Sequence, residues 1–573
     1  MHDIRFRFDE AAAFYGDLEN DAPLRVALPG SVVALDGDRR AWFSDDGTRV
    51  ERLSALEAAV LEACDVFQRP APQAADVADR TGLSREDAAR TIESLAARGL
   101  LATPIALLGE GLARERAPVP APLVAIRAHG NAGQLAALLD SLLAEERRLG
   151  AQRRYVVCEE SDDRALLDAT RRFAAASASS VWYLGSRERH ALIAAMFAPA
   201  DREALVALLQ PDARSPGSCA RNWTVLLSAG GTFALPDDAH RMPVREPVGT
   251  HFRLELNDSP EAETRFFDDE AGWHERPLVD GDAFAIAARW VGQPVRAIVP
   301  LDDARFVDLE NAPMAELARA TPRARVVCAS MGTYGEMPAQ AWPFATSRRT
   351  LSDLWRAPFQ PARLAGAHTW NGVRAPRLMY ALAGVPLLVD NRELLPFGHD
   401  DDGFARLLAA IEPGAACVWL PLLLGHFPAA PPTGRLYDGT LASLVASFGA
   451  GLSGERREAR FAAIAALCRE LASAGDDALA ARADGAAAIP RAEHARRLAV
   501  ALARPDAPAP WRERAVATLR GLRESLRADR PVASAPALRA QLAHMANAAA
   551  PWTAAWHACR ARPPLDAQAP VRA

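Results

Sequence analysis

Apolar positions along the chain follow two different periods. Between residues 123 and 430, short apolar runs typical of buried strands alternate with helix-like stretches, a pattern that predicts an α/β layered fold. Residues 436–573 repeat apolar positions every third or fourth residue and predict a separate all-α domain. The Pro-rich stretches 109–122 and 428–435 are predicted linkers. The strand-like runs are PLVAIRA, RRYVVCE, VWYLG, GTFALPD, PVRAIVP and ARVVCAS.

Residues 1–108 predict a small domain in which a hairpin, SVVALDGDRRAWFS, precedes three helices. Ser54 is the expected cap of the first helix, and Gly82 is the expected end of the second, DVADRTG. Ser84 caps the third helix, which ends at Gly99 before a short strand that starts at Leu100. A helix–turn–helix followed by a strand is the order of a winged helix, and helix–turn–helix folds commonly bind DNA.

DNA binding is one of three interpretations that this small domain leaves open. The third helix, SREDAARTIESLAARG, has three arginines opposed by three acids. A helix that meets phosphate is expected to be basic, so this balance disfavours nucleic acid as a partner. The domain could instead bind a peptide, or it could serve only to pack against its neighbour.

Arginine provides all 66 basic residues of the chain, which has no lysine and a formal net charge of −6. Without lysine, the chain cannot form a Schiff base with a substrate, and it can have neither a P-loop nor a protein-kinase site. Any phosphate would have to be bound by arginine, by a metal or by backbone N–H groups.

The seven cysteines are scattered and include no Cys-x-x-Cys pair, so neither a disulfide framework nor a cysteine zinc site is expected. The N-terminal MHDIRFRFDE lacks the apolar core of a signal peptide. No apolar run reaches the ~20 residues that span a bilayer. We therefore expect a cytoplasmic protein that does not enter a membrane.

Acidic residues gather where the predicted strands of the middle domain end. The second strand runs into CEESDD, and the third runs into Asp237 and Asp238. Because open α/β sheets bind ligands at the carboxyl ends of their parallel strands, these acids are candidate ligand-binding groups. Two carboxylates suit Mn²⁺ or Mg²⁺ held together with a substrate phosphate. A solvated turn is the alternative interpretation of the pair.

The order of these motifs resembles that of the family-two glycosyltransferases, which have a GT-A fold. The first two strands end at Arg127 and Glu159. A G-x-x-x-R-N segment, formed by Gly217, Arg221 and Asn222, precedes the two aspartates. The resemblance implies that Glu159 contacts a nucleotide base and that the G-x-x-x-R-N segment lies near the nucleotide sugar. Arg127, Arg221 or Arg241 is a candidate clamp for the phosphates of that donor.

The same resemblance implies a metal on the diphosphate of the sugar nucleotide, bound by an Asp-x-Asp motif. Pro236 stands where the first acid of that motif is expected. The predicted ligands are therefore Asp237 and Asp238, or Asp238 with His240. His426, in the run VWLPLLLGHFP, matches the late metal-binding histidine of the family. A structural histidine at a strand end is the alternative, and the expected ion is Mn²⁺ or Mg²⁺.

A cluster of acids stands at the start of a predicted apolar helix in VDNRELLPFGHDDDGFARLL. In the family that the chain resembles over residues 122–428, an acidic pair at this point supplies the general base of inverting members. The resemblance therefore implies that Asp402 is the general base, with Asp401 beside it. Neighbouring carboxylates repel, which makes one of them a better proton acceptor near neutral pH. Alternatively, the acids only cap the helix, whose dipole favours them there.

Residues 25–105 contain, in this order, a hairpin and the segments DGDRRAWF, LEAAVLEACD and DVADRTGLSREDAARTIESLAARGLL. This order resembles that of the PqqD-like domains, which hold precursor peptides for modifying enzymes. The resemblance implies a peptide that adds as a strand beside the hairpin. The combined expectation is a glycosyltransferase that binds a nucleotide sugar and modifies a peptide or protein. A non-catalytic GT-A scaffold and a winged-helix regulator remain open, as does assembly into a homo-oligomer.

Overall fold

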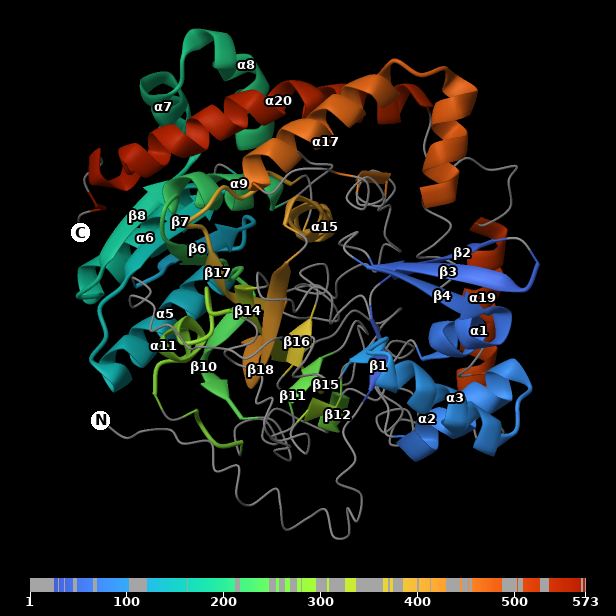
Figure 1. The fold of residues 1–573 in the computed structure, drawn as a ribbon. Helices are drawn as coiled ribbons and strands as arrows, with labels where there is room; N and C mark the ends of the chain where they lie inside the picture. The colour runs from blue at the N-terminus through green and yellow to red at the C-terminus, as the bar shows by residue number, and fades with distance from the viewer. Residues whose placement is uncertain are drawn as a thin grey trace.

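The computed structural model has a mixed α/β fold with a large mixed sheet, a small N-terminal antiparallel sheet and C-terminal helices (Figure 1). Of the two predicted linkers, residues 109–120 and 429–435 lie outside the described residues. The structure describes residues 25–28, 30–35, 37–44, 49–64, 70–102, 121–161, 163–211, 217–246, 254–256, 263–267, 276–279, 281–294, 307–308, 325–335, 364–368, 372–374, 385–398, 401–412, 414–428, 444–445, 452, 456–486, 502, 509–525, 535–567 and 570–571. Within these ranges, every helix is too short or too polar to cross a membrane.

The N-terminal module contains the predicted hairpin and three helices. Its elements are β1 (Val26–Ala27), β2 (Gly30–Ala34), β3 (Arg39–Ser44), β4 (Val50–Ser54), α1 (Ala55–Ala63), α2 (Pro70–Thr81), α3 (Arg85–Ala97) and β5 (Leu101–Ala102). Strand β4 extends the hairpin into an antiparallel sheet of order β2-β3-β4. Helix α2 begins at Pro70, before the predicted DVADRTG segment. The strand after α3 pairs with β1, at the start of the module.

Local sequence signals explain where these helices begin and end. The Ser54 hydroxyl accepts a hydrogen bond from the Glu57 N–H, and the Glu57 carboxylate accepts one from the Ser54 N–H, which is a capping box. Ser84 caps α3, and Gly82, with φ of +75°, follows the end of α2 in the left-handed conformation that glycine favours. The module has its own hydrophobic core, which includes Trp42, Val60, Val77, Ile92 and Leu95.

The large sheet combines thirteen strands from the described residues. They are β6 (Leu123–Ala128), β7 (Arg154–Glu159), β8 (Ser180–Leu184), β9 (Thr232–Ala234), β10 (His240–Arg245), β11 (Leu254–Leu256), β12 (Glu263–Phe267), β13 (Val307–Asp308), β14 (Arg325–Gly335), β15 (Leu364–His368), β16 (Gly372–Arg374), β17 (Val385–Asp390) and β18 (Ala415–His426). The main path runs β13-β11-β16-β18-β14-β17-β9-β6-β7-β8, with β10 on β18 and with β15 on β12 and β14. Strands β6, β7, β8, β9 and β14 confirm five of the predicted runs. The sixth, PVRAIVP, lies outside the described residues apart from Pro294.

Helices cover both faces of this sheet. They are α5 (Ala132–Leu149), α6 (Arg164–Ala176), α7 (Ser186–Met196), α8 (Pro199–Leu209), α9 (Ser218–Leu227), α11 (Ala283–Ala288), α15 (Asp401–Ile411), α17 (Arg457–Ala472) and α20 (Ala535–Ala561). The described residues also include a helix that is not part of these layers, α19 (Ala509–Ser525). Val124 and Ile126 of β6 share a core with α5 and α6, whereas Leu123 and Ala125 share one with α8 and α9. Because both faces are covered, residues 123–126 of β6 are all apolar, and Arg127 is the polar exception near the carboxyl end of the strand.

The chain changes the direction in which it adds strands at β6. It passes through α5 to β7 and through α6 to β8, which all run parallel, and then places β9 on the other side of β6. The carboxyl ends of β6 and β9 therefore form a topological switch point, where open α/β sheets bind ligands. Arg127 of β6 and Asp237, just beyond β9, are paired there in a parallel bridge.

Helices α17 and α20 share one hydrophobic core with the α/β domain, which they cover together with α8 and α9 (Figure 1). The indole N–H of Trp552 donates to the Leu395 carbonyl at 2.8 Å, and that of Trp556 donates to the Asn391 side chain at 2.9 Å. Asn391 in turn donates to the Val225 carbonyl of α9 at 2.6 Å. The tail is thus helical as predicted in its described parts, but α17 and α20 belong to the same core as the sheet.

Candidate metal centre

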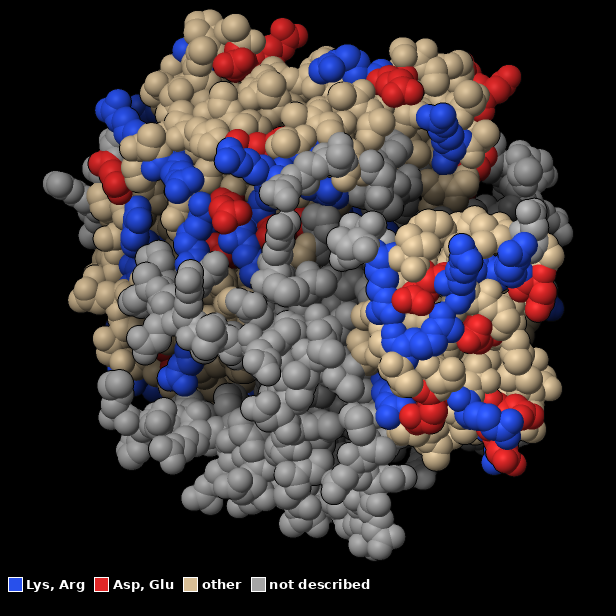
Figure 2. Space-filling view, viewed as in Figure 1, with Lys and Arg blue, Asp and Glu red and all other residues tan. Residues whose placement is uncertain are grey.

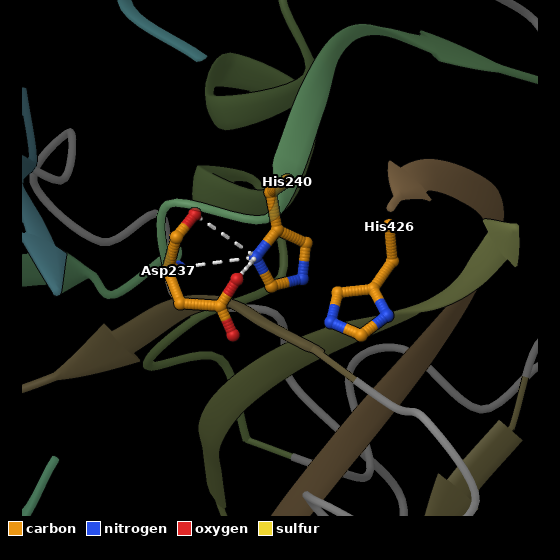
Figure 3. Close-up of side chains that lie close together, drawn as sticks. All are labelled: Asp237, His240 and His426. Carbon is orange, nitrogen blue, oxygen red and sulfur yellow. Dashed lines mark hydrogen bonds and ion pairs between the residues drawn. The ribbon is translucent and has the colours of Figure 1, made fainter. Parts of the chain in front are cut away.

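Three side chains that can bind a metal lie together at the switch point. Asp237 follows β9, His240 starts β10 and His426 ends β18 (Figure 3). Their ligand atoms all lie within 4.8 Å of one another. The antiparallel pairing of β10 with β18 sets His240 opposite His426, and the centroids of the two rings are 5.0 Å apart. Strand pairing therefore brings together residues that are far apart in the sequence.

Asp237 interacts with the Nδ1 atom of the His240 ring. Nδ1 of His240 lies 2.7 Å from Oδ1 of Asp237 and 3.0 Å from the backbone nitrogen of that residue. Nε2 of His240 is buried and has no hydrogen-bond partner within the described part of the chain. A buried polar atom without a partner costs about 1–3 kcal/mol. The donor set and this unpartnered nitrogen fit a bound metal ion.

The pKa of Asp237 lies below its ordinary value. Burial raises this pKa, but the neighbouring charges of His240, His426 and Arg127 lower it by more. Nη2 of Arg127 lies 3.8 Å from Oδ2 of Asp237. The carboxyl group is therefore an anion near neutral pH, which is the form that binds a cation.

Asp238, predicted as a metal ligand, interacts with a different partner. Its Oδ2 accepts a hydrogen bond from the backbone N–H of His129 at 2.9 Å. Burial raises the pKa of Asp238, and this hydrogen bond offsets part of the rise. The structure groups Asp237 and His426 with His240 and leaves Asp238 outside that group. Sequence reasoning named His240 only as a partner of Asp238, because the register between β10 and β18 is not readable from the sequence.

Gly217, predicted near the nucleotide sugar, lies directly against Arg127. It has φ of +83°, and a Cβ there would lie 3.0 Å from Nη1 of Arg127 and 3.5 Å from Cε1 of His129. Glycine therefore allows the first turn of α9 to approach the end of β6 closely. Glu160 accepts hydrogen bonds from the N–H groups of Gly217 and Ala220 at 2.8 Å, and it lies 3.6 Å from Nδ1 of His129. Sequence reasoning missed His129, which directly follows β6, and it named Glu160 only as one of the acids in CEESDD.

Glu159 ends β7 at the same edge of the sheet. Its carboxylate accepts a hydrogen bond from the Ser161 hydroxyl at 2.8 Å and lies 3.4 Å from the Tyr183 hydroxyl. Only 1% of the Glu159 surface is exposed. In this arrangement, Glu159 stabilises the turn that follows β7.

Arg221 and Asn222 are buried and form hydrogen bonds within the protein. Nη1 of Arg221 donates to the Gly398 carbonyl at 3.3 Å, and the Gly398 N–H donates to Oδ1 of Asn222 at 3.1 Å. Nδ2 of Asn222 donates to the Leu208 carbonyl at 3.0 Å. The guanidinium of Arg221 also lies over the Phe404 ring, 5.9 Å from its centroid. Both residues thus connect α9 with the segment that leads into α15.

Asp401 and Asp402, the predicted catalytic pair, are the first two residues of α15, and their side chains lie outside the description. Three peptide units separate Gly398 from Asp401, so their Cα atoms are at most about 11 Å apart. Since Gly398 is bonded to Arg221 and Asn222, α15 begins close to α9.

Two glycines hold neighbouring strands close to His426. Gly335 of β14 has φ of +129°, and a Cβ there would overlap the carbonyl oxygen of His426. At Gly425, a Cβ would lie 3.2 Å from both Cβ and the carbonyl oxygen of Arg241 in β10. A side chain at either position would push β14 or β10 away from the end of β18 that carries His426.

Comparisons with protein-family models, with curated proteins and with solved structures found no match for this chain.

Proposed function

We propose that the chain is a glycosyltransferase with a GT-A-like middle domain that transfers a sugar from a nucleoside diphosphate to an acceptor. One observation carries the proposal. Asp237 follows the carboxyl end of β9, His426 ends β18, and His240 at the start of β10 joins them in one group, with Arg127 beside Asp237. A cation site next to a guanidinium suits a diphosphate, and a topological switch point is where sheets of this type bind ligands.

The residues of the site have distinct roles in this proposal. A divalent cation held by Asp237, His240 and His426 would neutralise charge on the departing diphosphate. Arg127, whose guanidinium has only donors, would bind a phosphate oxygen. The bond between the anomeric carbon and the diphosphate oxygen breaks, and a bond from that carbon to the acceptor oxygen or sulfur forms. Asp402 would accept the proton that the acceptor loses.

The N-terminal module, which we interpret as a PqqD-like winged helix, suits a peptide acceptor. Strand β2 lies at the edge of its sheet, and such an edge can accept a further strand. Three apolar side chains on the outer face of this sheet are exposed, namely Val33, Phe43 and Val50, at 47%, 40% and 58%. A peptide that pairs with β2 could cover part of this apolar surface.

The charges on this module do not favour nucleic acid. Arginine and acidic side chains are interleaved over the face of the module that Figure 2 shows. Arg90 of α3 is paired with Glu86 of the same helix. Arg98, directly after α3, is paired with both Glu51 and Glu57. These arginines are balanced by acids, so the module lacks the strong excess of positive charge that a phosphate backbone attracts.

Calorimetric titration with nucleotide sugars tests the proposal. We expect UDP- or GDP-linked sugars to bind the full chain in the presence of Mn²⁺ and to bind more weakly after chelation of the metal. Arg127→Gln should weaken this binding by about 10–100-fold, the usual range for losing a charged hydrogen bond. Arg171→Gln, on the exposed side of α6, is the matched control and should leave it unchanged. If no nucleotide sugar binds, the enzyme proposal is wrong and a non-catalytic scaffold is favoured.

Asp402→Asn tests the proposed general base. The amide keeps the shape of the carboxylate but cannot accept the acceptor's proton, so we expect transfer to be lost while the nucleotide sugar still binds. Rates of sugar transfer and calorimetric affinities, measured on the same preparation, separate these two effects. Full turnover by this variant would remove Asp402 from the mechanism.

A further inference from the structure

We propose that the centre formed by Asp237, His240 and His426 selects a transition-metal ion of the Zn²⁺, Fe²⁺ and Mn²⁺ class and discriminates against Mg²⁺. The inference rests on the proposed function for the role of the ion and deepens it by naming the class of ion. The observation behind it is the donor set, which consists of one carboxylate and two imidazoles within 4.8 Å.

The chemistry of the donors favours transition metals. Imidazole nitrogen binds Zn²⁺, Fe²⁺ and related ions well, and a set of two histidines with one carboxylate is typical of such ions. Mg²⁺ instead keeps a shell of oxygen ligands and usually binds proteins through one or two carboxylates. The sequence offers a second carboxylate at Asp238, but its Oδ2 accepts the His129 N–H. Nitrogen donors therefore outnumber the carboxylate in this group.

The unpartnered nitrogen of His240 points to the same class of ion. The side chain of His240 is only 5% exposed, and its Nε2 has no hydrogen-bond partner among the described residues. The ring of His426 lies beside it, with a centroid separation of 5.0 Å. A metal that accepts imidazole would use the nitrogen of His240 that the fold has already buried, whereas Mg²⁺ would gain little from it.

The backbone around the centre holds its ligands in a fixed arrangement. The N–H of Phe427 donates to the Ala239 carbonyl at 2.9 Å, which ties the end of β18 to the turn before β10. The N–H of Asp238 donates to the Arg127 carbonyl, also at 2.9 Å. Oδ2 of Asp238 accepts the His129 N–H, and the Asp238 carboxylate is not part of the group. The site therefore does not convert readily into the oxygen-rich one that Mg²⁺ prefers.

Metal titrations of the full chain test this inference. The protein is freed of metal by chelation and then titrated separately with Zn²⁺, Mn²⁺ and Mg²⁺ by calorimetry. We expect Zn²⁺ to bind most tightly, Mn²⁺ to bind less tightly, and Mg²⁺ to bind at least about 100-fold more weakly than Zn²⁺. Equal affinities for Zn²⁺ and Mg²⁺ would overturn the inference. The inference would also be overturned if none of the three ions bound the protein.

Histidine variants locate the bound ion. We expect His240→Gln to weaken Zn²⁺ binding by at least about 10–100-fold. Mutating a residue that only hydrogen-bonds to a metal ligand already weakens metal binding by about that much. His190→Gln, an exposed histidine on α7, is the matched control and should bind Zn²⁺ normally. His426→Gln serves if His240→Gln does not fold, because His426 is only partly buried. Normal Zn²⁺ affinity in a folded His240 or His426 variant would contradict the proposed site. Because no substrate is needed, Zn²⁺ binding without nucleotide-sugar binding would reject the function and leave this inference standing.

Discussion

In an Asp237→Asn variant, we expect metal-dependent sugar transfer to fall by at least about 100-fold, which corresponds to roughly 3 kcal/mol of transition-state stabilisation. Asp237 is the one carboxylate in the group with His240 and His426. An amide of the same shape carries no charge and is a poorer ligand, so the variant should lose both the cation and the charge that it neutralises. Initial rates of transfer with a UDP-sugar, together with a metal titration, measure the effect.

Asp238→Asn is the matched control for that variant. An asparagine at this position keeps an oxygen that can accept the His129 N–H, so the local hydrogen bond survives the substitution. We expect this variant to bind metal and to transfer sugar at close to the original rate. A loss as large as that of Asp237→Asn would instead support the pair of aspartates that the sequence predicts, and the histidine-containing group would have to be abandoned.

A chain shortened to residues 1–430 should fail to fold its α/β domain. The cut removes α17 and α20, whose buried residues belong to the same core as the sheet. Trp552 and Trp556 are almost fully buried and donate hydrogen bonds to Leu395 and Asn391. Losing a buried tryptophan costs about 3–5 kcal/mol, against a total stability of about 5–15 kcal/mol for a typical domain. Thermal denaturation followed by circular dichroism should show no cooperative transition of the α/β domain.

Residues 121–573 provide the opposite truncation as a control. The N-terminal module has its own core, so its removal should leave the α/β domain folded, with a cooperative transition near that of the full chain. Trp552→Ala in the full chain should lower the same transition. A cooperative, protease-resistant α/β domain in residues 1–430 would show that the helices after the second linker are a separate unit, as the sequence alone predicts.

Local patterns predicted much of the secondary structure. The capping box at Ser54 and the left-handed Gly82 depend on residues that are neighbours in the chain, so a short window of sequence contains the information. The apolar runs of β6 and β7 were recognisable for the same reason, because a strand covered on both faces is apolar at every position. Strand β4 and the first part of α2 were missed, since their sequences lack an equally clear periodicity.

The composition of the candidate site was less predictable than its position. Acids and Arg127 at strand ends indicated the edge of the sheet at which Asp237, His240 and His426 lie, because parallel strands present their carboxyl ends together. Which side chains meet there depends on partners that are distant in the sequence. Asp238 and His129 are an example: one backbone N–H engages the carboxylate that the Asp-Asp motif offers as a metal ligand.

The sequence by itself determined the class of fold and the types of chemistry that are excluded. Period and composition are local properties, so an α/β middle region, a helical tail and the absence of lysine could be read directly. Only the tertiary structure decided that His240 and His426 lie opposite each other and that α17 and α20 share the core of the sheet. The register of β10 on β18 and the packing of Trp552 against Leu395 are long-range contacts. Such contacts join residues that are far apart in the sequence, so no short window of the sequence contains the information that sets them.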